Sequence, residues 1–101
     1  MTIENEIINW SKNKDSFYFF LPDGPYGRPF DNQYVIKSID NNAVGFNIVF
    51  SEGISLEFIG QSLITIENNK IKIYNFKKLI FRPEENFFKE YYSGEVVING
   101  F

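Results

Sequence analysis

The sequence contains no cysteine and no histidine among its 101 residues. These absences exclude disulfides, thiolate zinc sites, cysteine nucleophiles and imidazole bases. Any catalysis would have to rest on carboxylates, lysine, tyrosine or serine, and any metal site on oxygen ligands alone. We therefore expect no metal site and no cofactor, and the sequence favours a non-catalytic protein.

Positive charge is also scarce, because 10 lysine and arginine residues stand against 13 acids and the net charge is −3. A protein that grips a phosphate backbone relies on clustered lysine and arginine, so we expect no nucleic-acid partner. The first residues lack the basic segment and apolar run of a signal peptide, and no window is long and apolar enough for a membrane span. We expect a cytoplasmic protein with no membrane partner.

Aromatic residues are plentiful, at 19% of the chain with 12 phenylalanines and 6 tyrosines. Residues of this kind favour strands, and a chain of this length forms one domain, residues 1–101. Short apolar runs separated by turn residues predict a mainly β (α+β) fold. We expect an antiparallel meander curled into a small barrel or roll, with a helix at the N-terminus.

The N-terminal helix is expected over residues 3–12. Ile3, Ile7 and Trp10 recur there at helical spacing, behind Thr2 as a possible N-cap. The apolar stripe predicts that this helix packs on the sheet.

A second, short helix is expected near residues 84–92, because Pro83 precedes two acids and then aromatic residues at helical spacing. A loop is the alternative. The aromatic segment 87–92 begins at Phe87 and ends at Tyr92. If exposed, it would make a protein-binding or homodimer surface; core filling is the other interpretation.

Two Asn-Asn pairs predict the tight turns of β-hairpins. A turn at Asn41-Asn42 would place Ile39 opposite Val44. A turn at Asn68-Asn69 would oppose four isoleucines in two pairs on one face of the sheet.

The stretch 20–33 does not have the pattern of a strand. It holds three of the four prolines and two of the seven glycines. Proline lacks a backbone donor and restricts the residue before it, so we expect a shaped loop over 22–32 that presents polar groups. The candidate binding residues of this loop are Asp23, Tyr26, Arg28, Asp31 and Asn32.

Two interpretations of the loop remain open. As a recognition surface, Arg28 offers a planar fork to a carboxylate or phosphate, and Tyr26 offers contact area. As a structural brace, Arg28 pairs with Asp23 or Asp31 of the same loop.

The strings LPDGPYGRPFDN at 21–32 and YSGEV at 92–96 resemble small bacterial proteins with an LPDG-x-x-GRP-x-D pattern. The resemblance covers a small part of the chain. It implies a bacterial, cytosolic, single-domain protein, and it brings no activity and no catalytic residue with it.

The sequence is most consistent with a non-catalytic protein-binding module that uses loop 22–32. One alternative is a small-molecule binder with its ligand beside Tyr26 and Arg28. Another is a carboxylate-based enzyme, for which Asp23, Asp31 and Glu57 are the first candidates.

Overall fold

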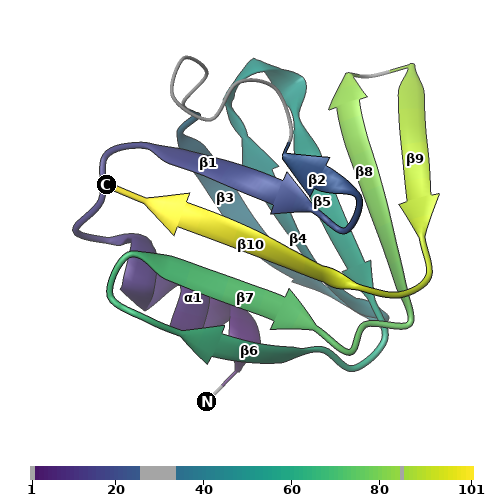
Figure 1. Ribbon diagram of the computed structural model, residues 1–101, viewed down its shortest axis with the longest axis horizontal. Coiled ribbons are helices and arrows are strands. Elements are labelled where there is room, and N and C mark those ends of the chain that lie inside the picture. The colour runs from purple at the N-terminus through teal and green to yellow at the C-terminus, as the bar shows by residue number, and fades with distance from the viewer. Residues whose placement is uncertain (1, 26–33, 85) are drawn as a thin grey trace.

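The computed structural model describes residues 2–25, 34–84 and 86–101. Figure 1 shows these residues as two layers of strands with one helix beside them. The elements are α1 (Ile3–Ser11), β1 (Phe17–Leu21), β2 (Gly24–Pro25), β3 (Ile36–Asn42), β4 (Gly45–Phe50), the 3-10 turn η1 (Ser51–Gly53), β5 (Ser55–Ile59), β6 (Leu63–Ile66), β7 (Lys70–Tyr74), β8 (Lys78–Glu84), β9 (Phe87–Tyr91) and β10 (Glu95–Gly100).

The strands form two five-stranded sheets in which the paired neighbours are antiparallel. The first sheet has the order β2-β1-β10-β7-β6 and the second β3-β4-β5-β8-β9. The mainly β fold with an N-terminal helix is confirmed. The described strands do not close into a barrel, because β2 and β6 are edges of the first sheet and β3 and β9 are edges of the second.

Three connections between the sheets gather at one corner of the molecule, namely β5 to β6, β7 to β8 and β9 to β10 (Figure 1). Each contains a residue with positive φ: Gly60 at 91°, Asn75 at 63° and Gly94 at 101°. A left-handed residue reverses the chain sharply, and glycine and asparagine adopt this conformation at least cost. These residues therefore let the chain pass from one sheet to the other within a short turn.

The core lies between the sheets and is built mainly from phenylalanine and isoleucine. Alternate residues of the central strands point inward, as in β4, where Phe46, Ile48 and Phe50 are buried. Phe19 of the first sheet stacks on Phe50 of the second, with ring centroids 5.0 Å apart. The two sheets thus share one continuous apolar core.

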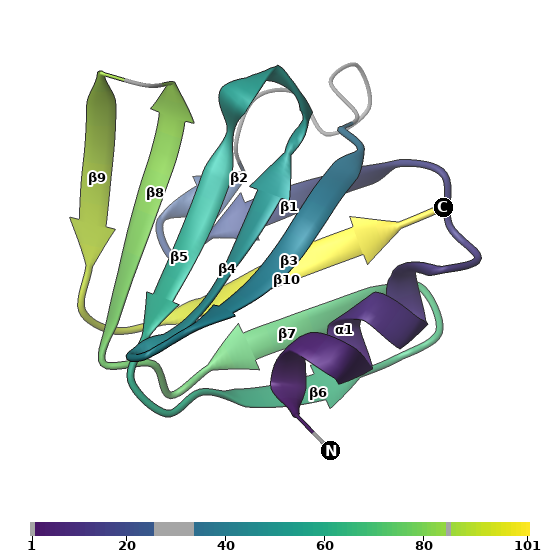
Figure 2. The same ribbon diagram turned by 180° about the vertical axis from the view of Figure 1, so that it is seen from behind.

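Helix α1 packs along the open side of the two layers, in contact with β3 and β6 (Figure 2). Ile7 is fully buried, Ile3 and Trp10 pack partly buried against the core, and the Trp10 indole N–H donates to the carbonyl oxygen of Glu67 at 3.0 Å. The predicted helix and its apolar stripe are confirmed. No helix in the described part of the chain is long and apolar enough to cross a bilayer.

The hairpin at residues 68–69 has the predicted register. Ile66 lies opposite Ile71, and Ile64 lies opposite Ile73. The side chains of Glu67 and Lys70 approach to 3.6 Å beside the turn.

The first hairpin turn is displaced from its predicted position at Asn41-Asn42. Strand β3 continues through Asn42, which pairs with Gly45, so Ile39 lies opposite Ile48 and not opposite Val44. Two local facts explain the shift. The side chain of Asn42 accepts the N–H of Val44 at 2.9 Å, which is an Asx turn. A Cβ at Gly45 would lie 1.9 Å from the carbonyl oxygen of Phe58, so only glycine fits this paired position.

The short helix predicted near 84–92 is wrong, because this segment contains the strand β9, paired with β8. Pro83 lies inside β8, where the register between the two strands shifts between Phe81 and Glu84. A bulge tolerates a proline because the regular hydrogen-bond ladder is already broken there. The aromatic residues that follow favour a strand once β8 offers a partner.

We predict that Phe19→Ala strongly destabilises the fold, because Phe19 is 1% exposed and connects the two sheets. The free energy of unfolding should fall by about 3–5 kcal/mol. This is a large part of the roughly 5–15 kcal/mol by which a typical domain is stable. Urea unfolding followed by circular dichroism measures it. Phe88→Ala is the matched control, since Phe88 is 60% exposed and should change stability by about 0.5 kcal/mol or less. Equal losses in the two variants would contradict this account of the core.

Candidate functional site

The structure describes one of the five candidate binding residues, Asp23. Tyr26, Arg28, Asp31 and Asn32 lie outside the described residues, as do the ion pairs proposed for Arg28. The site is therefore built from Asp23 and from what surrounds it.

Asp23 links the two sheets. Pro22 and Asp23 form the two-residue turn between β1 and β2, where Leu21 pairs with Gly24. One carboxylate oxygen of Asp23 lies 2.5 Å from the Lys89 ammonium, and the other accepts the Tyr91 hydroxyl at 3.0 Å. Both partners belong to β9, so the carboxylate ties a turn of the first sheet to an edge strand of the second.

The charges of this cluster stabilise one another. The hydrogen bond to Lys89 lowers the pKa of Asp23 below its usual value, and the same contact raises the pKa of Lys89. Burial raises the pKa of the Tyr91 hydroxyl, and its bond to Asp23 raises it further. At neutral pH Asp23 is an anion held by a cation and a neutral donor. Because both of its oxygens have partners within the chain, the contacts favour a bracing role.

The turn at Asp23 also touches the connection between β9 and β10. A Cβ at Gly94 would lie only 2.7 Å from the Cβ of Pro22, so the proline ring packs directly on the glycine backbone. The sequence strings 21–32 and 92–96 therefore meet here in space through Pro22 and Gly94.

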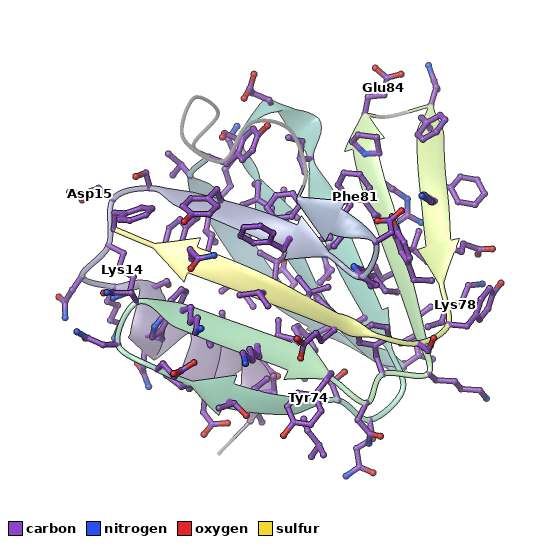
Figure 3. The ribbon with its side chains drawn as sticks, viewed as in Figure 1. Lys14, Asp15, Tyr74, Lys78, Phe81 and Glu84 are labelled. Atoms are coloured by element: carbon purple, nitrogen blue, oxygen red, sulfur yellow. The ribbon has the colours of Figure 1, made fainter. Side chains whose placement is uncertain are left out.

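Strand β9 differs from the other three edge strands. β3 and β6 are each contacted by α1, and β2 ends at Pro25, the last residue described before the gap at 26–33. β9 has five residues and pairs only with β8 in the described part of the chain. In Figure 3, Lys78 and Glu84 mark the two ends of β8, and β9 lies along its outer side. The far edge of β9 is thus open for further pairing among the residues that the structure describes.

Three large aromatic side chains near this edge are exposed. Phe87 is 54%, Phe88 60% and Tyr92 66% exposed. We call the open edge of β9 together with these three rings the β9 surface. The sequence indicated this segment as a possible interface, and the structure places it at the rim of a sheet.

The charges on β9 have partners within the chain. The Glu90 carboxylate lies 2.6 Å from the Lys78 ammonium and accepts the Tyr92 hydroxyl at 3.1 Å. The contact with Lys78 lowers the pKa of Glu90, and the same contact raises that of Lys78. Lys89 pairs with Asp23, so both charged side chains of β9 are compensated by an opposite charge within the chain.

The carboxylates considered for catalysis are separated. Glu57 of β5, Ile80 of β8 and Glu90 of β9 lie opposite one another, so their side chains point to the same face of the second sheet. Lys89, which binds Asp23, lies opposite Phe81 and points to the other face. Glu57, held by Arg82 at 3.0 Å, therefore lies on the face of the second sheet that is turned away from Asp23. The third candidate, Asp31, is outside the described residues.

The described residues form no pocket, and no group of three among their acids is placed to hold a metal ion. Tyr26 and Arg28, which the ligand-binding interpretation names, lie outside this part of the chain. No protein-family model, no curated protein and no solved structure matches this chain. The β9 surface and the Asp23 cluster are therefore interpreted from their own geometry.

Sequence reasoning did not predict Lys89 and Tyr91 as partners of Asp23. They lie 66 and 68 residues away in the chain, and no local pattern connects positions so far apart. A signal for β9 itself was available, because a dense aromatic run favours a strand as readily as a helix.

We predict that the Asp23 cluster contributes stability only when Asp23 is ionised. Its folded-state pKa is below the ordinary value of 3.8, so this contribution is present above that pH and is lost as the pH falls through the lowered value. Asp23→Asn should lower the free energy of unfolding at pH 7 and change it much less near pH 2. Urea titrations at the two pH values measure this. The effect at pH 7 should shrink in a Lys89→Met background, and an undiminished effect there would argue against the pair.

We predict that Gly94→Ala destabilises the fold by about 1–3 kcal/mol, because it adds a clash with Pro22 to an unfavourable positive φ. Gly53→Ala is the control. Gly53 also has a positive φ, 77°, but a Cβ there meets nothing within 4 Å. Thermal unfolding should show the larger loss for Gly94→Ala, and equal losses would mean that the Pro22 contact contributes nothing.

Proposed function

We propose that this chain is a non-catalytic protein-binding domain that binds through the β9 surface. The observation that carries the proposal is the combination of an open five-residue edge strand with exposed aromatic side chains at the same place. The resemblance of the strings at 21–32 and 92–96 to small bacterial proteins supports a bacterial, cytosolic setting for this function.

An open edge strand offers the backbone groups that an additional strand requires. Its outward N–H and C=O groups pair with any extended segment that runs alongside, which is how several domains bind peptides. Helix α1 packs against the edge strands β3 and β6, whereas β9 has no partner beyond β8 among the described residues.

The exposed rings supply the apolar contact. Aromatic side chains are enriched among the residues that carry the binding energy of interfaces. Phe88 and Glu90 project from one face of β9, while Phe87 has the opposite parity. Tyr92, the bend residue directly after the strand, donates its hydroxyl to Glu90 and so lies on the same side as Phe88. A partner strand paired with β9 would contact rings on both of its faces.

The polar contacts of β9 hold this surface in place before binding. Asp23 anchors Lys89 and Tyr91, and Lys78 anchors Glu90. A strand already fixed in position loses less conformational entropy when a partner binds. We propose that Tyr26, Arg28, Asp31 and Asn32, which lie outside the described residues, also take part in binding.

The experiment uses the full chain as immobilised bait in an extract of its own host. We expect a partner that the Phe88→Asp variant does not retain. Val44→Asp is the matched control, because Val44 is 56% exposed but lies in the β3–β4 turn. With the purified partner, calorimetry should show at least a tenfold weaker affinity for Phe88→Asp, since loss of an aromatic anchor costs about 2 kcal/mol. Equal affinities for wild type and Phe88→Asp would refute the proposal.

A further inference from the structure

We infer that the strand bound by β9 is the β9 strand of a second copy of this chain. This inference rests on the proposed function and names its partner. The pairing would join the second sheets of two copies into one continuous sheet.

Symmetry limits how two β9 strands can pair. Two copies related by a two-fold axis perpendicular to the sheet pair their edges antiparallel and keep the same face of each sheet on the same side. Residues that face each other across such an axis must have the same parity. The axis therefore passes between two equivalent residues, such as Glu90 of one copy and Glu90 of the other.

The pairing centred on Glu90 matches the exposed aromatic residues. It places Phe88 of each copy opposite Tyr92 of the other, the bend residue directly after β9, and the two-fold axis produces this contact twice. Both rings are more than half exposed in the single chain, and aromatic pairs across antiparallel strands are favourable. The order Phe88, Glu90, Tyr92, with a ring on each side of the carboxylate, is what makes the strand complementary to itself.

The charge distribution of β9 permits this pairing. Two glutamates facing each other would repel, but each Glu90 has its own Lys78 ammonium at 2.6 Å and the Tyr92 hydroxyl at 3.1 Å. Charged side chains usually protect edge strands against unwanted pairing. Here Lys89 and Glu90 are compensated within the chain, so that protection is weakened.

The neighbouring pairing, centred on Lys89, is less favourable. It would place Phe88 opposite Glu90 of the second copy, so the exposed ring of Phe88 would face a carboxylate. The Glu90-centred pairing instead brings ring to ring and leaves Lys89 facing Tyr91 of the second copy.

The experiment has two parts, and the first measures mass. Sedimentation equilibrium of the full chain over a concentration series should show a reversible dimer of the 11.9 kDa chain. Phe88→Asp removes two contacts per dimer, so the dissociation constant should rise about a hundredfold. Val44→Asp, with similar exposure in the β3–β4 turn, should leave the constant unchanged, because β5 and β8 lie between β4 and β9.

The second part tests the register with single cysteines, which is straightforward because the natural sequence has none. Directly opposed residues of antiparallel strands lie about 4.5–5.5 Å apart between Cα atoms, within reach of a disulfide. Glu90→Cys should therefore give a covalent dimer under mild oxidation, and Lys89→Cys should not.

A wild-type chain that stays monomeric at every concentration would overturn the inference. So would a dimer that is insensitive to Phe88→Asp, or one that Lys89→Cys cross-links in place of Glu90→Cys. If the chain is monomeric but still binds another protein through Phe88, the proposed function stands and only its assignment to a second copy fails. If Phe88-dependent binding is absent as well, both fail.

Discussion

The stacking of aromatic side chains between two sheets is the interaction on which the rest of this structure depends. In a chain of 101 residues a single core has to offset the loss of conformational entropy. Phe19 packs on Phe50 across the layers, and Phe46 on Phe58 within the second sheet, 4.8 Å between ring centroids. Every inward position of the central strands contributes to this core, so the sheets cannot slide past each other without exposing it.

The path of the chain follows from that core. Three tight connections at one corner hold the sheets together there, with left-handed residues such as Gly60 and Gly94. Two further contacts hold the sheets together: α1 packs against β3 of one sheet and β6 of the other, and the Asp23 carboxylate binds Lys89 of β9. The turn at Asp23 lies against the β9–β10 connection, where Pro22 packs on Gly94, so the polar cluster adds to the contacts near that corner, whereas the helix joins two edge strands.

The same arrangement explains why β9 is both ordered and open. It is the last strand of its sheet, and its charged side chains are directed to partners in β8 and in the turn at Asp23. Its inner-parity residue Tyr91 is half-buried, whereas Phe88 is exposed. Within the described residues, β9 pairs with β8 on one side and with no strand on the other, and such an edge can accept a further strand, which is the physical basis of the proposed binding function.

The sequence by itself determined the mainly β class, the amphipathic helix and the hairpin at 68–69, because each depends on periodicity or turn chemistry within a few residues. It did not determine β9, whose aromatic run suits a helix or a strand equally and becomes a strand because β8 lies beside it. Nor did it indicate that Asp23 would bind Lys89 and Tyr91. Only the tertiary structure decided these features, since contacts between residues so distant in the chain arise from the packing of two sheets and leave no local pattern.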